Sequence, residues 1–289
     1  MHPKNPHNNR YNLEVLIKAH PALEEFTHTI PSGTKTIDFS ISKAVFHLNK
    51  ALLLAHYNLT DWNIPDGYLC PPIPSRADYL LYLNDLLQQN NLSHTINILD
   101  IGTGANCIYP LLAVTLLGWD AVGCDSDAVA VKAAKNNVMA TEDLLEKIEI
   151  RYQNNNAHIF KGIILPGEFY HATVCNPPFY ASEEEANKST LRKLKKLNPE
   201  KSVLELERNF KGRPNELWCN GGEALFIKRM VKQSVAFKEQ VGWFSTLVSR
   251  SETLPKLYKL LIKLGATYET LQMQHGNKIT RVVAWRFKE

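Results

Sequence analysis

The chain has 289 residues, of which 44% are hydrophobic and 21% charged, and its formal net charge at pH 7 is +4. These values are ordinary for a globular protein, and the length allows one large or two small domains with a real core. The longest apolar run, Cys107 to Gly118, is too short to span a bilayer, and no C-x-x-C pair supports a zinc site. Residues Met1 to Asn12 are polar without an apolar h-region, so we expect no signal peptide. We therefore expect a cytoplasmic protein without a membrane partner and without a metal.

The first 90 residues predict a mostly helical N-terminal region. An amphipathic pattern covers residues 13–26, and further helices are expected over 44–57 and 76–87. The stretch from Ile64 to Pro74 contains four prolines and a glycine, which favour an extended, stiff connection between the second and third helices.

Strands and helices alternate from about residue 95 to the end of the chain. Apolar strand patterns cover 96–101, 119–124, 147–152, 171–175, 241–248, 267–273 and 281–287, and helical patterns cover 108–117, 127–138, 223–237 and 254–264. This alternation predicts an α/β protein with a doubly wound, Rossmann-like sheet of seven strands. The last two strands have no helix between them, which predicts an antiparallel final edge. That edge departs from a dinucleotide dehydrogenase and suits a class I methyltransferase, with residues 1–90 as an extension and 91–289 as the catalytic domain.

A glycine motif, Asp100-Ile101-Gly102-Thr103-Gly104, lies where the first strand of this sheet should turn into a helix. Gly102 and Gly104 allow positive φ and a close approach of the backbone to a ligand, and Asp125 ends the next strand, where an acid can accept both ribose hydroxyls of a nucleoside. Position 107 is Cys rather than the third glycine that a pyrophosphate favours. The motif therefore indicates S-adenosylmethionine rather than NAD as the cofactor, although a lone G-x-G can also be a plain turn.

A second motif, Asn176-Pro177-Pro178-Phe179, follows the apolar strand 171–175. The two prolines lock the backbone and remove two N–H donors, so the Asn176 side-chain carbonyl and the Pro177 main-chain carbonyl remain as acceptors for an aromatic amine. Phe179 offers a ring on which a base can stack. We expect these four residues to be catalytic, with Asn176 also bordering the cofactor; the alternative is an ordinary Asn-Pro turn.

A basic segment follows this motif within an insert at about 181–220. Residues 188–213 contain nine basic and three acidic side chains, a local charge of +6. We expect this segment to bind RNA phosphates, although an isolated run of charge is more often a solvated surface. The candidate RNA-binding residues are Lys193, Lys195, Lys196, Lys211 and Arg213.

Long motifs throughout the chain resemble the bacterial 23S ribosomal RNA adenine methyltransferases that modify position 1618, to which the human methyltransferase-like 16 protein is related. The matching segments are 2–5 with 10–11, 70–79, 100–110, 176–179 and 216–223. The resemblance implies N6 methylation of an adenine in 23S ribosomal RNA, free or in a large-subunit assembly intermediate, by a protein that we expect to be a monomer. It also implies that Arg76 lies on the cofactor or RNA side of the pocket, and that 153–156 is the loop that touches the cofactor adenine. We assign Asp100 and Thr103 to the cofactor site with the glycines.

Two other functions remain open at this stage. A protein glutamine methyltransferase would present a similar planar amide to the Asn176 motif, although the basic insert argues against it. A cofactor-sensing RNA-binding protein with little turnover is the second alternative, and the intact Asn176 to Phe179 motif argues against that.

Overall fold

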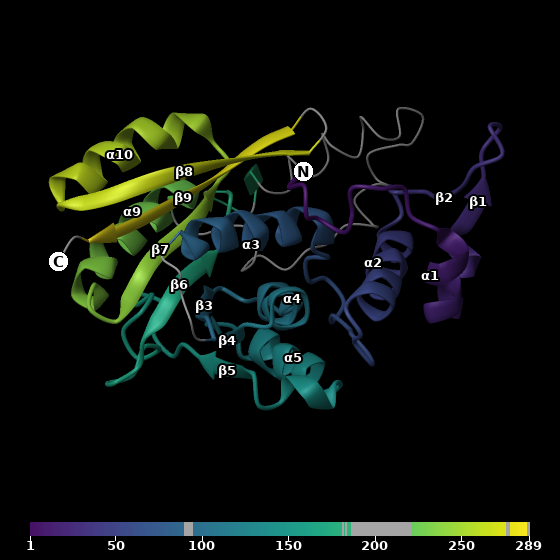
Figure 1. Cartoon of the computed structure of the whole chain (residues 1–289), viewed down its shortest axis with the longest axis horizontal. Coiled ribbons are helices and arrows are strands. Elements are labelled where there is room, and N and C mark those ends of the chain that lie inside the picture. Colours follow the sequence, from purple (N-terminus) through teal and green to yellow (C-terminus); the bar gives the residue numbers. More distant parts are fainter. Residues whose placement is uncertain (90–94, 181, 183, 186–220, 276–277, 288–289) are drawn as a thin grey trace.

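The computed structural model describes residues 1–89, 95–180, 182, 184–185, 221–275 and 278–287. Its centre is a seven-stranded sheet in the order β5-β4-β3-β6-β7-β9-β8 (Figure 1). The strands are β3 (Asn97–Ile101), β4 (Asp120–Asp125), β5 (Ile148–Tyr152), β6 (Tyr170–Cys175), β7 (Val241–Val248), β8 (Ala266–His275) and β9 (Lys278–Phe287). The first five strands of this order, β5, β4, β3, β6 and β7, are parallel to one another. Strand β9 is antiparallel to both of its neighbours, β7 and β8. The predicted doubly wound sheet with an antiparallel edge is confirmed.

Helices cover both faces of the sheet because successive strand residues point to opposite sides. On one face, Ile98 packs in a hydrophobic cluster with residues of α3 (Ile73–Gln88), α4 (Ile108–Leu117) and α5 (Ala128–Met139). On the opposite face, Leu99 packs in a second cluster with residues of α9 (Gly222–Ser234) and α10 (Leu254–Lys263). Short 3-10 helices complete the described part: η1 (Pro21–Phe26), η2 (Glu142–Leu144), η3 (Val235–Phe237) and η4 (Ser251–Thr253).

The N-terminal region holds α1 (Leu13–Ala19) and α2 (Ser42–His56) beside the sheet domain (Figure 1). The amphipathic pattern over residues 13–26 forms two helices instead of one, because α1 ends before Pro21 and η1 begins at this proline. The sequence did not predict the small hairpin of β1 (Thr27–Thr29) and β2 (Lys35–Ile37), whose turn contains Gly33 at φ +78°. Three residues are too few for an alternating pattern to be visible.

The N-terminal region and the sheet share one hydrophobic core. Leu16, Leu52 and Trp62 belong to the same buried cluster as Ile98 and Leu112. The boundary near residue 90 therefore separates two regions of the sequence, but these regions do not have independent hydrophobic cores. In the described part of the chain, no helix combines the length and apolar character needed to cross a membrane.

Candidate active site

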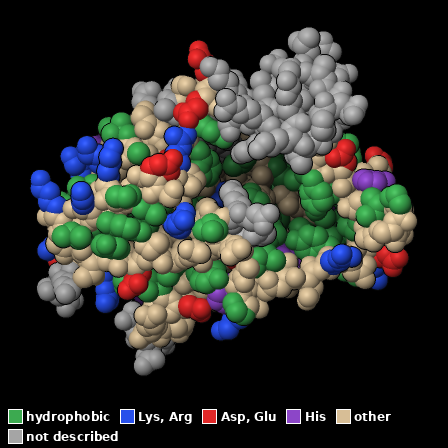
Figure 2. Space-filling view, turned by 90° about the horizontal axis from the view of Figure 1, so that it is seen from above, with side chains coloured by type: hydrophobic (Ala, Val, Ile, Leu, Met, Phe, Trp, Pro, Cys, Tyr) green, Lys and Arg blue, Asp and Glu red, His purple; other side chains and the backbone are tan. Residues whose placement is uncertain are grey.

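A cavity of about 310 Å³ lies at the carboxyl ends of the parallel strands, where ligands bind in open α/β sheets. Residues at or directly after the carboxyl ends of β3, β4, β5 and β6 contribute to its walls, including Gly102, Asp125, Gln153 and Asn176. Figure 2 shows that one side of the molecule is hollowed between hydrophobic side chains. Sequence positions far apart in the chain are thus brought to one pocket.

The glycine loop forms part of the wall of this cavity. Gly102 and Gly104 both line it, at φ +75° and +63°, in the conformation that favours glycine. The backbone N–H groups of Gly102 and Thr103 donate to the carbonyl of Cys124, which holds the loop against the end of β4. A Cβ at Gly102 would meet nothing within 4 Å, so the space beside the loop is open for a ligand.

Asp125, at the end of β4, ties the glycine loop to the next helix. Its Oδ2 accepts from the Gly104 N–H at 2.9 Å, and its Oδ1 accepts from the Asp127 N–H at 2.9 Å. Burial raises the pKa of this carboxyl above its ordinary value, against the backbone hydrogen bonds that lower it. Each carboxylate oxygen can accept more than one hydrogen bond, so the site can also accept ribose hydroxyls. The glycine loop, the open space and this acid therefore fit a nucleoside cofactor.

The neighbouring Asp127 has a different task. Its Oδ1 accepts from the Val129 N–H at the start of α5, which makes it the N-cap of that helix. Its Oδ2 accepts from the Tyr68 hydroxyl at 2.7 Å. Because Leu69 lines the cavity, this bond holds the proline-rich connection of the N-terminal region against the pocket.

The turn after β6 presents unused acceptors to the cavity. Asn176, Pro177 and Pro178 line it, directly after buried Cys175. The Asn176 Oδ1 is buried and has no hydrogen-bond partner among the described residues. A buried acceptor without a partner is costly, so a ligand that donates a hydrogen bond here would be favoured. Phe179 is half-buried and follows these residues without lining the cavity itself.

A buried hydroxyl network fixes the strand that carries this turn, and the sequence did not indicate it. The Tyr79 hydroxyl lies 2.8 Å from the Ser245 Oγ and accepts from the Cys175 N–H at 3.4 Å. Ser245 in turn donates to the carbonyl of Thr173. These side chains from α3 and β7 therefore position the residue that precedes Asn176.

Helix α9 supplies two further wall residues that sequence reasoning missed. Phe226 and Arg229 line the cavity, and the Arg229 guanidinium lies over the Phe226 ring at 5.6 Å from its centroid. The Arg229 Nε is buried without a hydrogen-bond partner in the described part of the chain. No local motif marks these residues, because their role depends on how α9 packs.

Three predicted cofactor residues lie behind the cavity wall. Arg76, Asp100 and Thr103 are buried and do not line the pocket. Arg76 donates to the Tyr109 hydroxyl at 3.1 Å and lies over that ring at 5.5 Å. Neither oxygen of Asp100 has a hydrogen-bond partner among the described residues. Their assignment to the cofactor stays a prediction.

Asp100 makes the stability of the protein depend on pH. Burial raises its pKa from 3.8 to about 7, so between these values the folded chain retains a proton that the unfolded chain releases. Stability should fall as pH rises through this window, and Asp100→Asn should remove that loss. Denaturant unfolding at pH 5 and pH 8 should show a variant that gains stability over the wild type at the higher pH. Parallel pH profiles for the two proteins would contradict this account.

The five candidate RNA-binding residues, Lys193, Lys195, Lys196, Lys211 and Arg213, lie outside the described residues. Within the described residues, no group of three or more His, Cys, Asp or Glu side chains is arranged to hold a metal ion.

The sheet with its antiparallel edge, the glycine loop and the acceptor-rich turn after β6 together define a class I methyltransferase, the class that takes its methyl group from S-adenosylmethionine. A family model described as an RNA methyltransferase matches residues 1–289. The chain belongs to this RNA methyltransferase family, and the resemblance seen in its motifs is confirmed.

Named relatives and solved structures agree with this family. A ribosomal RNA large subunit methyltransferase F from Christiangramia forsetii is 52% identical over 288 residues, covering 99% of this chain and 100% of the relative. The enzyme of the same name from Bacteroides thetaiotaomicron is 43% identical over 302 residues, with coverages of 100% and 98%. The catalytic domain of human METTL16, crystallised with a hairpin of the MAT2A 3′UTR, is 26% identical with a TM-score of 0.82, covering 100% of this chain and 98% of that one.

Proposed function

We propose that the chain transfers a methyl group from S-adenosylmethionine to the exocyclic N6 amine of an adenine in 23S ribosomal RNA, at position 1618 by its family resemblance. The observation that carries the proposal is the buried Asn176 Oδ1, an acceptor without a partner at the wall of a cavity that fits a nucleoside. The names of the relatives support a ribosomal substrate for them. A METTL16 structure that contains SAH supports the cofactor class.

The residues around the cavity divide between cofactor and target base. Gly102 and Gly104 let the backbone approach the cofactor, and Asp125 accepts its ribose hydroxyls. Asn176 and Pro177 accept from the two hydrogens of the target amine, and Phe179 provides a ring for stacking. Leu69, held through the Tyr68–Asp127 bond, covers the cofactor from the N-terminal region.

The proposed chemistry needs no strong base. An aromatic amine is nearly planar and a poor nucleophile, and two acceptors draw it towards tetrahedral geometry, which localises its lone pair. S-adenosylmethionine supplies the electrophilic methyl group. As the bond from the amine nitrogen to the methyl carbon forms, the bond from that carbon to the sulfonium sulfur breaks and its electron pair stays on the sulfur of the departing thioether. The nitrogen becomes cationic, so the Asn176 carbonyl stabilises developing positive charge, and the methylated amine then releases its proton to solvent.

Methyl transfer to unmodified 23S ribosomal RNA, followed by mass mapping of the product nucleoside, tests this function. Incorporation into one adenine as N6-methyladenosine is the expected result. Transfer to a release-factor glutamine instead, or RNA binding without turnover, would identify one of the alternatives. Comparing deproteinised RNA with large-subunit precursors would show which of the two is the substrate of this enzyme, which we propose acts in the cytoplasm as a monomer.

The basic insert provides a separate test of RNA binding. Neutralising Lys193, Lys195 and Lys196 to glutamine should weaken RNA binding across sequences and flatten its dependence on salt. Each lost phosphate contact should lower the log–log slope by roughly 0.7–0.9. Filter binding over a salt series measures the slope, and cofactor affinity is the control that should stay the same. An unaltered slope would mean that these lysines form only a solvated surface.

A further inference from the structure

One wall of the cavity is formed by the long connection between β5 and β6. Its residues Gln153, Asn156, His158 and Ile159 line the cavity. Ile159 and the following Phe160 are buried in the core, which anchors the connection just after the lining segment. The position of residues 157–159 therefore decides how wide the cavity is on this side.

The lining segment is partly braced from within the connection. The Gln153 side chain accepts from the Asn155 N–H and donates to the Lys161 carbonyl, and the Asn155 side chain accepts from the Ala157 N–H. These bonds shape the loop but do not attach it to the rest of the protein.

Gln233 on α9 makes that attachment. Its Nε2 donates to the Ala157 carbonyl at 2.7 Å, and its Oε1 accepts from the Ile159 N–H at 2.8 Å. One amide thus holds the backbone on both sides of His158. In the described part of the chain, no other side chain from outside the connection bonds to the backbone of residues 154–160.

Gln233 also lies on the same face of α9 as the cavity residues. Phe226, Arg229 and Gln233 are spaced by three and four residues, which places them along one stripe of a helix. Phe226 and Arg229 line the cavity, and Gln233 forms hydrogen bonds to the backbone of its wall. Helix α9 therefore both lines the cavity and holds the backbone of its 157–159 wall.

We propose that Gln233 is a positioning residue that holds the 157–159 wall in place and thereby sets the affinity for S-adenosylmethionine, an inference that rests on the function proposed above. Gln233 acts through the loop backbone and does not itself line the cavity. The 157–159 wall stabilises the bound cofactor equally before and during methyl transfer. Loss of the Gln233 side chain should therefore raise KM for the cofactor with little change in kcat.

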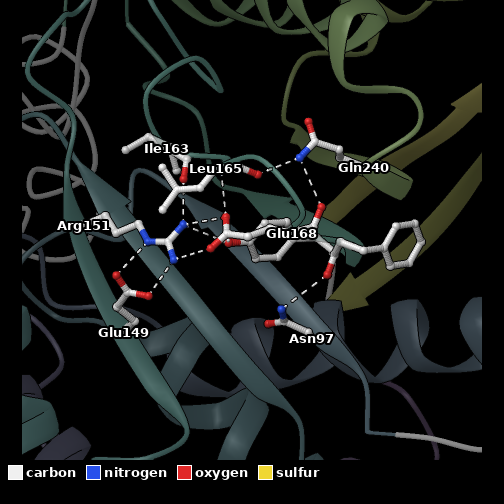
Figure 3. A network of polar contacts seen from close by, with 9 residues as sticks. Asn97, Glu149, Arg151, Ile163, Leu165, Glu168 and Gln240 are labelled. Atoms are coloured by element: carbon white, nitrogen blue, oxygen red, sulfur yellow. Dashed lines mark hydrogen bonds and ion pairs between the residues drawn. The ribbon is translucent and has the colours of Figure 1, made fainter.

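The chain contains a matched control, a second glutamine that bonds to the same connection from outside it. Gln240 is half-buried like Gln233, and its Nε2 donates to the carbonyls of Leu165 and Glu168 at 2.8 and 3.1 Å (Figure 3). Glu168 is further held by an ion pair of 2.6 Å with Arg151. Gln240 therefore ties down the other end of the connection by two hydrogen bonds, away from the residues that line the cavity.

The experiment compares Gln233→Ala, Gln233→Glu and Gln240→Ala by calorimetry with S-adenosylmethionine, by steady-state kinetics and by thermal melts. Gln233→Ala should weaken cofactor binding about five- to thirtyfold and raise KM to match, with kcat and RNA affinity nearly unchanged. Gln233→Glu keeps the acceptor for Ile159 but turns a carboxylate oxygen towards the Ala157 carbonyl, which repels it, so its affinity should fall at least as far as that of Gln233→Ala. Gln240→Ala should bind the cofactor as the wild type does.

The inference is overturned, with the proposed function left intact, by cofactor affinity within twofold of wild type in folded Gln233→Ala or by an equal loss in Gln240→Ala. A fall in kcat without a change in KM would also overturn it. A wild-type chain that binds no S-adenosylmethionine would instead refute the proposed function, and the inference with it.

Discussion

Asn176→Ala should lower the single-turnover rate of methyl transfer about a hundred- to a thousandfold at saturating RNA and cofactor, the usual cost of losing one preorganised partner of a transition-state charge. The Asn176 Oδ1 is buried without a partner in the described structure, so its hydrogen bond with the amine replaces no existing contact. That bond strengthens as the amine gains positive charge, so the effect belongs to kcat. Removing an unpaired buried acceptor should not lower stability, and thermal melts should show a folded variant.

The companion variant Phe179→Ala separates base capture from chemistry. Phe179 stacks on the base before and during the reaction in our proposal, so its loss should raise KM for RNA as well as lower kcat. An ordinary Asn-Pro turn would behave differently: Asn176→Ala would lose stability, with activity that follows the folded fraction. A well-folded Asn176→Ala protein that keeps more than about a tenth of the wild-type rate would refute the mechanism.

Asp125→Ala should weaken binding of S-adenosylmethionine about ten- to a hundredfold, because charge-assisted hydrogen bonds to hydroxyls contribute roughly 1.5–3 kcal/mol. Two losses act in the same direction. The ribose loses its acceptor, and the Gly104 N–H loses the carboxylate oxygen that holds the glycine loop at 2.9 Å. Isothermal calorimetry on the folded variant measures the affinity.

Asp127→Ala is a useful comparison for Asp125→Ala. Asp127 also lines the cavity, and its substitution removes the N-cap of α5 and the bond to Tyr68 that holds Leu69 against the cavity. It should therefore cost stability, about 1 kcal/mol for the cap alone, and weaken cofactor binding less than Asp125→Ala does. Unchanged calorimetric affinity in Asp125→Ala, or an equal loss of affinity in both variants, would show that the ribose is held elsewhere.

The strands, helices and motifs of the sheet domain could be predicted from the sequence because their signals are local. The alternating apolar segments placed β3 to β9 in their correct order, and the turns after β3 and β6 follow directly from Gly102, Gly104 and the two prolines at 177–178. In a parallel sheet the carboxyl ends of all strands meet at one edge, so these turns had to converge. Asp125 lines the same cavity because it too lies at the carboxyl end of a parallel strand.

The remaining features depended on packing between distant parts of the chain. Periodicity shows that a helix has an apolar face but not which element covers that face, so the roles of Phe226, Arg229 and Gln233 on α9 had no local sign. Nor did the pairing of Tyr79 with Ser245, 166 residues apart. The sequence by itself determined the sheet, the glycine loop and the acceptor-rich turn, since each is written in consecutive residues. Only the tertiary structure decided which side chains close the cavity and which, like Asp100, lie behind its wall, because those contacts are made across the core.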